Sequence, residues 1–238
     1  MPGEPAAVPY VLMYHSVAGR DNDRYQVTVS PQRFAEQMRW LRHRGFRGVS
    51  MREQLSAAGD ASARHMVGLT FDDGYADFAT AVVPVLLRYG FGATVFVVAG
   101  KLGEHNDWDQ EGPVKPLMTA DQVREVADAG MEIGSHGLHH LSLPPIGTKV
   151  LTAETRRSRE ILESLLGIPV RGFCYPYGHV SRRVAAAVDE AGYDYAVATW
   201  DQGRRDRRAL PRTYVGESDR SARLLMKKVR HRLRWGKP

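Results

Sequence analysis

The sequence predicts a single α/β domain in which parallel strands alternate with helices. Short apolar runs rich in β-branched residues recur along the chain, and most are followed by a segment with helical period or helix-capping residues. This alternation calls for a parallel sheet or barrel with helices on the outside. The 238 residues suffice for one such domain with a sizeable core, and are too few for two ordinary enzymatic domains joined by a linker.

The first half of the chain supplies four predicted strands and the helices between them. Ser30 and Pro31 open a helix as N-cap and first-turn proline. A helical period over residues 76–89 ends at Gly90, whose freedom at positive φ suits a helix C-terminus. The strands are expected at residues 8–14, 46–50, 66–70 and 93–98.

The second half continues the alternation. Thr119 and Gln122 form a capping box for one helix, another covers about residues 152–166, and Ser181 caps a third. The strands are expected at residues 131–135, 170–174, 194–199 and 210–215.

Side chains capable of catalysis follow these strands at the point where each strand ends. They are His15, Asp72, Asp73, His136 and Tyr177. In parallel α/β folds the active site lies at the carboxyl ends of the strands, so we expect these residues to lie close together.

An adjacent pair of carboxylates, Asp72 and Asp73, ends one apolar run. Like charges side by side repel, so a cation near the pair is expected. The histidines at 136 and 140 supply imidazole, and imidazole with carboxylate suits a borderline divalent metal such as zinc. One interpretation is a hydrolytic metal site in which one Asp binds metal and the other moves a proton. The alternative is a surface turn and an unrelated histidine cluster.

Three spaced motifs carry a resemblance to a known family. They are T-F-D-D-G-Y at residues 70–75, S-H-G-L-H-H at 135–140 and F-C-Y-P-Y-G at 173–178. In order and separation they resemble the first three motifs of the NodB-like polysaccharide deacetylases, carbohydrate esterase family 4. The resemblance runs from about residue 9 to about residue 215. It implies an irregular (β/α) barrel of about seven strands.

The resemblance implies that Asp73, His136 and His140 bind a divalent metal, most simply Zn²⁺, with Co²⁺ or Ni²⁺ as alternatives. Three protein ligands leave a position open, as a catalytic zinc site requires. For His139 the interpretation is a neighbouring imidazole, with replacement of His140 as the other alternative.

The resemblance also implies the catalytic roles. Asp72 would act as general base on the attacking water, and the backbone N–H of Tyr177 would stabilise the oxyanion. Relatives use a late histidine as the acid, but His231 lies in a basic tail. His15, in the segment L-M-Y-H-S-V, is therefore the predicted acid. It resembles the early Tyr-His of a subgroup that includes biofilm-polysaccharide N-deacetylases.

The chain departs from the family pattern at two positions. Cys174 stands where many relatives have Arg in the third motif, and Leu141 follows the second motif where Pro is common. That Arg orients the base, so another group must tune Asp72, and Cys174 is expected to be a small buried residue.

A polar connection over residues 100–117 with Trp108 is expected at the rim of the site, and Trp200-Asp201 either lines the pocket or belongs to the core.

Charge divides the chain into residues 1–219, the predicted deacetylase domain, and a basic tail at residues 220–238. The tail holds eight Lys or Arg and no acid, so removing it from the net charge of +6 leaves −2 for the domain. The sequence lacks the interleaved basic and aromatic residues of a nucleic-acid surface.

In the tail, Leu225, Val229 and Leu233 recur every four residues. This stripe either lies on an anionic membrane, which would make the protein peripheral at the inner membrane surface, or packs on the barrel.

The expected activity is removal of an N-acetyl group from an amino sugar by a metal-dependent hydrolase. A single cysteine and an N-terminus without basic and apolar signal regions predict a cytoplasmic protein. We therefore expect an intracellular glycoconjugate as substrate, either a lipid-linked sugar or a glycosylated biosynthetic intermediate. Deformylation, cyclic-amide hydrolysis and O-acetyl ester hydrolysis are enzymatic alternatives. A carbohydrate-binding module is disfavoured because binding alone needs no base beside a metal.

Overall fold

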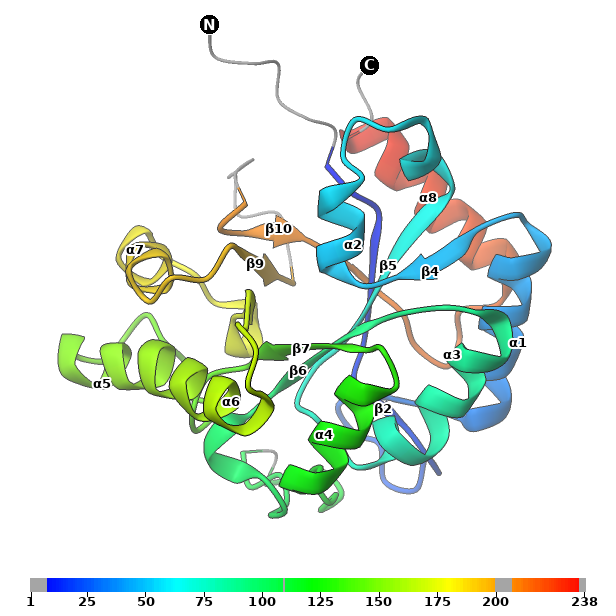
Figure 1. Ribbon diagram of the computed structural model, residues 1–238. Helices are drawn as coiled ribbons and strands as arrows, with labels where there is room; N and C mark the ends of the chain where they lie inside the picture. The colour runs from blue at the N-terminus through cyan, green and yellow to red at the C-terminus, as the bar shows by residue number, and fades with distance from the viewer. Residues whose placement is uncertain (1–7, 109, 200–206, 236–238) are drawn as a thin grey trace, which may run out of the picture.

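Parallel strands form the centre of the protein, a computed structural model that describes residues 8–108, 110–199 and 207–235 (Figure 1). The strand order is β10-β9-β8-β7-β6-β5-β1-β11, and β4 pairs with β5 beside this path. Every pairing is parallel. The strands are β1 (Val11–Tyr14), β4 (Arg47–Val49), β5 (Met66–Phe71), β6 (Thr94–Val97), β7 (Glu132–Ser135), β8 (Gly172–Cys174), β9 (Tyr195–Ala198), β10 (Leu210–Pro211) and β11 (Thr213–Tyr214).

One stretch of chain joins the two ends of this strand order. β10 pairs with β9 and β11 pairs with β1, and only Arg212 separates β10 from β11. The sheet therefore closes into the irregular barrel that the sequence predicts. Each of the eight predicted ranges contains a strand, against the family expectation of about seven. A separate pair of strands, β2 (Ser16–Val17) and β3 (Thr28–Val29), was not predicted. A strand of two residues is too short to show a hydrophobic period.

Helices surround the strands, as Figure 1 shows. The predicted caps are present: Ser30, Ser181 and the Thr119–Gln122 capping box all make their hydrogen bonds. The helices are α1 (Pro31–His43), α2 (Met51–Ser56), α3 (Val83–Tyr89), α4 (Ala120–Asp128), α5 (Thr148–Thr152), α6 (Ser158–Leu166), α7 (Arg182–Glu190) and α8 (Ser221–Trp235). Short 3₁₀ turns lie at Ala61–His65, Ala99–Lys101 and Pro176–Gly178.

Two predicted helices differ from expectation in their first turns. The segment predicted at 76–89 begins with a π-helical turn, Phe78–Val82, directly before α3. Pro84 lies at the start of α3 and has no backbone N–H, so the regular ladder cannot run through this point. The segment predicted at 152–166 starts earlier, because α5 continues through the π-helical Ala153–Arg157 into α6.

Two clusters make up most of the core. A large cluster fills the space between helices and strands, with residues such as Leu12, Phe71 and Phe173. A smaller cluster lies among β1, β6, β8, β9 and β10 and includes Phe96 and Cys174. Cys174 is fully buried, as predicted for a small core residue. No helix in the described ranges has both the length and the apolar character needed to cross a bilayer.

The basic tail forms the predicted helix, α8, but one of the two predicted roles of its stripe is wrong. Leu225, Val229 and Leu233 are exposed rather than packed on the barrel. The contacts to the barrel come from a different side of α8, through Leu224, Lys228 and residues near them.

Candidate metal centre and active site

The structure brings the predicted site residues together at the carboxyl edge of the barrel. His15 follows β1, the Asp pair follows β5, His136 follows β7 and Tyr177 lies after β8. Because parallel strands all end at the same edge, residues as distant in sequence as His15 and Tyr177 lie at one end of the barrel.

Three donor atoms converge at this edge. Asp73 Oδ1 lies 3.3 Å from His136 Nε2 and 3.3 Å from His140 Nε2, and all three side chains are buried. Two ligand atoms each about 2.0–2.1 Å from a tetrahedral zinc are separated by roughly 3.3 Å, so the spacing fits such an ion. The residues form one of two groups in the described ranges that could hold a metal. His139 belongs to neither group, so its alternative role as replacement for His140 has no support in the geometry.

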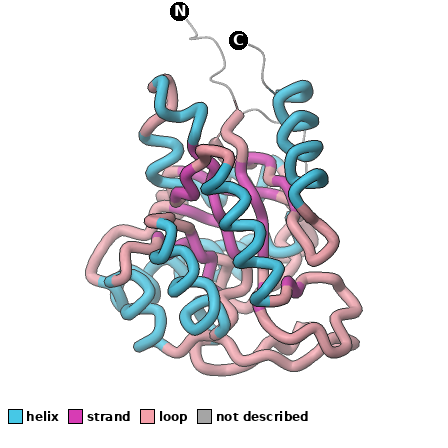
Figure 2. Tube along the Cα trace, turned by 90° about the vertical axis from the view of Figure 1, so that its right-hand side faces the viewer, coloured by secondary structure: helices cyan, strands magenta, loops and turns pink. Residues whose placement is uncertain are grey.

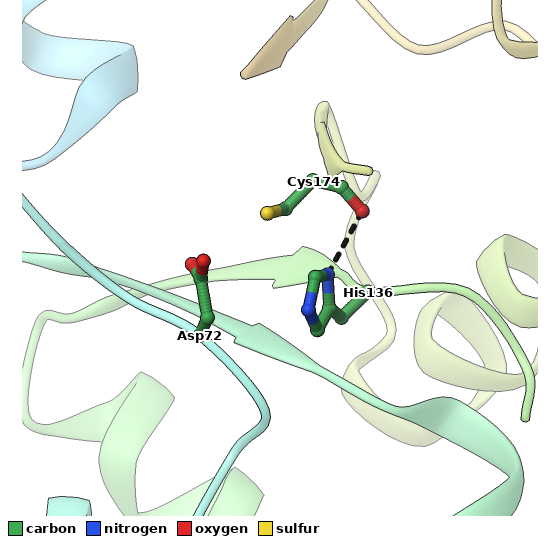
Figure 3. Close-up of side chains that lie close together, drawn as sticks. All are labelled: Asp72, His136 and Cys174. Atoms are coloured by element: carbon green, nitrogen blue, oxygen red, sulfur yellow. Dashed lines mark hydrogen bonds between the residues drawn. The ribbon is translucent and has the colours of Figure 1, made fainter. Parts of the chain in front are cut away.

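Neighbouring groups orient the two imidazoles. Nδ1 of His136 lies 2.9 Å from the carbonyl oxygen of Cys174 (Figure 3). Donation to that carbonyl leaves Nε2 without a proton and able to bind a cation. The Trp108 ring stacks on His140 at a centroid distance of 4.2 Å, and the Tyr177 ring packs edge-on against His140 at 4.6 Å. The rim position predicted for Trp108 is thus confirmed.

The histidines differ in their acid–base behaviour. Burial lowers the pKa of His140, which favours the neutral ligand form. Burial also opposes the charged form of His136, but contacts with Cys174 and Asp73 outweigh it and raise its pKa. Metal binding here must therefore displace a proton, and affinity should fall as pH falls.

Backbone strain coincides with the site. Five non-glycine residues in the described ranges have positive φ, and three of them are Asp73 (72°), His140 (59°) and Tyr177 (59°). This region is unfavourable for residues with a side chain and is often found at functional sites. Gly74 continues the left-handed turn, where an added Cβ would meet Val97 Cα at 3.2 Å. The turn sends the neighbouring carboxylates in different directions.

Asp72 meets a guanidinium that sequence reasoning missed. Arg212 binds it with both nitrogens, at 2.6 Å to Oδ1 and 2.7 Å to Oδ2, and both side chains are buried. Burial alone would raise the pKa of Asp72, but the charge and hydrogen bonds of Arg212 lower it below the ordinary value. Arg212 also lies 3.2 Å from Cys174 Sγ. The group that tunes Asp72 therefore comes from the residue between β10 and β11 and not from the third motif.

A signal for Arg212 was present in the sequence. It stands inside the otherwise apolar run predicted as the last strand, and an Arg in a buried strand needs a carboxylate partner. The partner could not be identified, since Asp72 lies 140 positions away.

The second potential metal group, Asp72, His136 and Cys174, is a poorer site (Figure 3). The guanidinium of Arg212 already holds both oxygens of Asp72 and would repel a metal cation. Burial raises the pKa of the Cys174 thiol, so the thiolate that binds metals is disfavoured. The Asp73 group is the better candidate on both counts.

His15 lies beside Asp72. Its Nε2 is 3.9 Å from Asp72 Oδ2, and its buried Nδ1 has no hydrogen-bond partner among the described residues. The residues after it are fixed by Asp77, which accepts from Ser16 Oγ at 2.6 Å and from Val17 N–H at 3.0 Å. This anchoring keeps the turn after β1 next to the metal group.

A buried carboxylate fixes the loop that carries the second histidine. Glu154 accepts hydrogen bonds from the backbone N–H groups of Leu138 and His139, and from the ring of His139. His139 therefore acts within this loop as a neighbour, and its side chain is half exposed.

An open groove of about 690 Å³ leads to the site. Its walls include Trp108, His140, Leu141, Tyr177 and His179. The aromatic rings give the groove flat apolar surfaces beside the buried polar centre. The residues Trp200-Asp201, considered as a pocket wall from sequence, lie outside the described residues.

Comparisons with known proteins point in one direction. The family profile described as polysaccharide deacetylase matches residues 59–196. The chain is 29% identical over 198 residues to the putative polysaccharide deacetylase YxkH of Bacillus subtilis, covering 82% of this chain and 66% of that protein. It is 27% identical over 222 residues to the poly-beta-1,6-N-acetyl-D-glucosamine N-deacetylase of Escherichia coli, covering 77% and 32%. The chain thus spans two thirds or less of these relatives.

Solved structures agree on the fold. The Streptococcus pyogenes deacetylase PplD in complex with acetate superposes with a TM-score of 0.80 at 24% identity, covering 94% of this chain and 99% of that one. IcaB from Ammonifex degensii gives a TM-score of 0.77 at 23% identity, with 93% and 97% covered.

Proposed function

Because the chain belongs to the polysaccharide deacetylase family, we propose that it is a metal-dependent N-deacetylase. The reaction is hydrolysis of the acetamide of an N-acetylated amino sugar. The observation that carries this proposal is the separation of two adjacent carboxylates: Asp73 lies with two histidines, and Asp72 lies with a guanidinium. Asp73 is thereby placed to bind a cation, and Asp72 is placed to accept a proton.

The metal ligands in this proposal are Asp73, His136 and His140, and the ion is zinc. A bound divalent cation would polarise the acetyl carbonyl and lower the pKa of water in the site. The residues are suited to this by their convergent donor atoms and by the orientation of His136 toward the Cys174 carbonyl.

Asp72 is the proposed general base. Arg212 lowers its pKa, so it is ionised at neutral pH and ready to take a proton from the attacking water. The two-point contact also fixes the carboxylate plane, which a single hydrogen bond would not do.

His15 is the proposed acid, and Tyr177 the proposed oxyanion donor. An amide nitrogen leaves poorly unless it is protonated, and an imidazole is the side chain best suited to donate that proton near neutral pH. His15 lies in the site, with Nε2 3.9 Å from Asp72 Oδ2. The backbone N–H of Tyr177 would donate to the oxygen that gains charge. The strained φ of 59° at Tyr177 supports a special backbone role.

The proposed substrate is an intracellular glycoconjugate that carries an N-acetylated amino sugar. The open groove beside Trp108 and Tyr177 offers apolar surface to a sugar ring. The buried free cysteine is in keeping with a reducing compartment. Some relatives are named as poly-beta-1,6-N-acetyl-D-glucosamine N-deacetylases. An oligomer of that polymer is therefore the substrate with which the glycoconjugate is compared.

A substrate panel tests the proposal. Zinc-loaded protein is given a lipid-linked N-acetylglucosamine, a β-1,6-linked N-acetylglucosamine oligomer, an N-formyl analogue and an O-acetyl ester, and released acetate and formate are measured. We expect acetate from the two N-acetyl substrates, with the lipid-linked sugar the better of the two. Asp73→Ala protein, shown to be folded, should bind little zinc and release little acetate.

The other outcomes each remove part of the proposal. Preference for the oligomer would replace the glycoconjugate by a polymer, and formate release without acetate would make the protein a deformylase. Full zinc occupancy in both Asp73→Ala and His136→Ala proteins would refute the ligand assignment.

A further inference from the structure

The last helix, α8, packs against the barrel through its polar side. Lys228 Nζ lies 3.3 Å from the centroid of the Phe46 ring, and Lys227 binds Asp219 at 2.5 Å and the Tyr214 carbonyl at 2.7 Å. The ring of His231 lies 5.0 Å from Tyr10. Only one apolar residue of α8, Leu224, is buried with them.

The apolar side of α8 faces outward. Leu225 is 40% exposed, Met226 62%, Val229 48% and Leu233 84%. Their spacing of three and four residues places them on one side of the helix. Figure 2 shows α8 at the margin of the molecule, as the helix that leads to the C-terminus. The helix therefore has the reverse of the usual arrangement, in which apolar residues face the core.

Cations border the exposed stripe. Arg230 lies beside it on one side and Arg232 on the other, and both are exposed. Residues 220–238 contain no acidic residue. An apolar strip with basic borders is the arrangement of helices that lie in the interface of an anionic membrane. The charge argues against a second copy of this chain as the occupant, since a symmetric contact would bring the same arginines together.

We propose that α8 docks the folded protein on an anionic lipid bilayer. Leu225, Met226, Val229 and Leu233 enter the boundary between head groups and acyl chains, while the bordering arginines meet lipid phosphates. The barrel keeps α8 oriented, because Lys227, Lys228 and His231 hold its opposite side.

Vesicle sedimentation with the full chain tests this surface. We expect binding to phosphatidylglycerol vesicles, little binding to phosphatidylcholine vesicles, and weaker binding as salt is raised. Val229→Ser/Leu233→Ser should lose most binding. The control is Leu87→Ser/Ile168→Ser, which changes two apolar residues outside α8 that are each 52% exposed. Arg230→Gln and Arg232→Gln should each weaken binding about fivefold.

Circular dichroism establishes that each variant is folded, so binding is compared among native proteins. Three outcomes would overturn the proposal: no sedimentation with phosphatidylglycerol at low salt, equal loss in the stripe and control variants, or a lipid-free dimer that the stripe variant dissociates. The measurement needs no catalytic activity, so its result is independent of the proposed reaction.

Discussion

The carboxyl edge of the barrel and helix α8 both reverse the usual distribution of polar and apolar residues, in opposite ways. At the barrel edge, ionisable side chains such as Asp72, Asp73 and Arg212 are buried. On α8, apolar side chains such as Val229 and Leu233 are exposed. Both arrangements cost free energy in an isolated chain, so each calls for a compensating partner.

The partners are found in different places. Asp72 has Arg212, Asp73 has two imidazoles, and Glu154 has the loop after β7. The buried charges of the barrel edge are thus compensated by other parts of the same chain. The α8 stripe is exposed, while Lys227 and Lys228 on the opposite side of the helix contact the barrel. The barrel edge is thus a site whose partners lie within the fold, whereas the α8 stripe is a surface suited to an external partner.

Asp72→Asn is expected to have the largest effect. A positioned general base contributes about 10²–10⁴-fold to rate, so acetate release should fall by that factor. The variant should keep its metal, whereas Asp73→Asn should lose it, and metal analysis with single-turnover assays separates the two. Loss of metal from Asp72→Asn protein would show that both carboxylates are needed for metal binding.

Arg212→Met should destabilise the protein by about 3–5 kcal/mol, because it leaves the buried Asp72 carboxylate without its partner. Denaturant unfolding measures this, with the exposed Arg88→Met as control. A stability within 1 kcal/mol of the wild type would show that the edge does not depend on this ion pair.

The same variant has a pH signature. In the wild type the lowered pKa of Asp72 means that the pair stabilises the fold above the ordinary pKa of about 4, and that this stabilisation is lost as pH falls through the lowered value. Without Arg212, burial raises the pKa of Asp72. The acid limb of the pH–rate profile should therefore move to higher pH.

His15→Ala should act selectively. Loss of a general acid should reduce amide hydrolysis by about 10²–10⁴-fold, while an activated acetyl ester, whose leaving group hardly needs a proton, should be nearly unaffected. Parallel assays of both substrates check this. Equal losses on the two substrates would assign His15 to positioning Asp72 and not to proton transfer.

Two leucines of α8 provide the smallest and most direct test of the comparison. Leu224→Ala should cost about 2–5 kcal/mol because Leu224 is 1% exposed. Leu233→Ala, the same change at a residue 84% exposed, should stay within about 0.5 kcal/mol. Comparable losses in denaturant unfolding would mean that the stripe packs on the protein in solution.

The sequence by itself determined the order of strands and helices and the edge at which the site lies. Strand and helix periods are local, as are the caps at Ser30, Thr119 and Ser181, and parallel strands end at one edge whatever their order. The motifs around Asp73, His136 and His140 then sufficed to predict which side chains meet, and the structure places each imidazole 3.3 Å from the Asp73 carboxylate.

Only the tertiary structure decided which group holds Asp72 and which side of α8 faces the barrel. Arg212 reaches Asp72 because β10 and β11 close the barrel, with β11 paired to β1. Arg212 and Asp72 are 140 positions apart, and no local pattern encodes their contact. The α8 stripe was visible in the sequence, but its orientation depends on Phe46, Tyr10 and Asp219 accepting the basic side. Periodicity identifies an apolar face, and the contacts of the opposite face determine where it points.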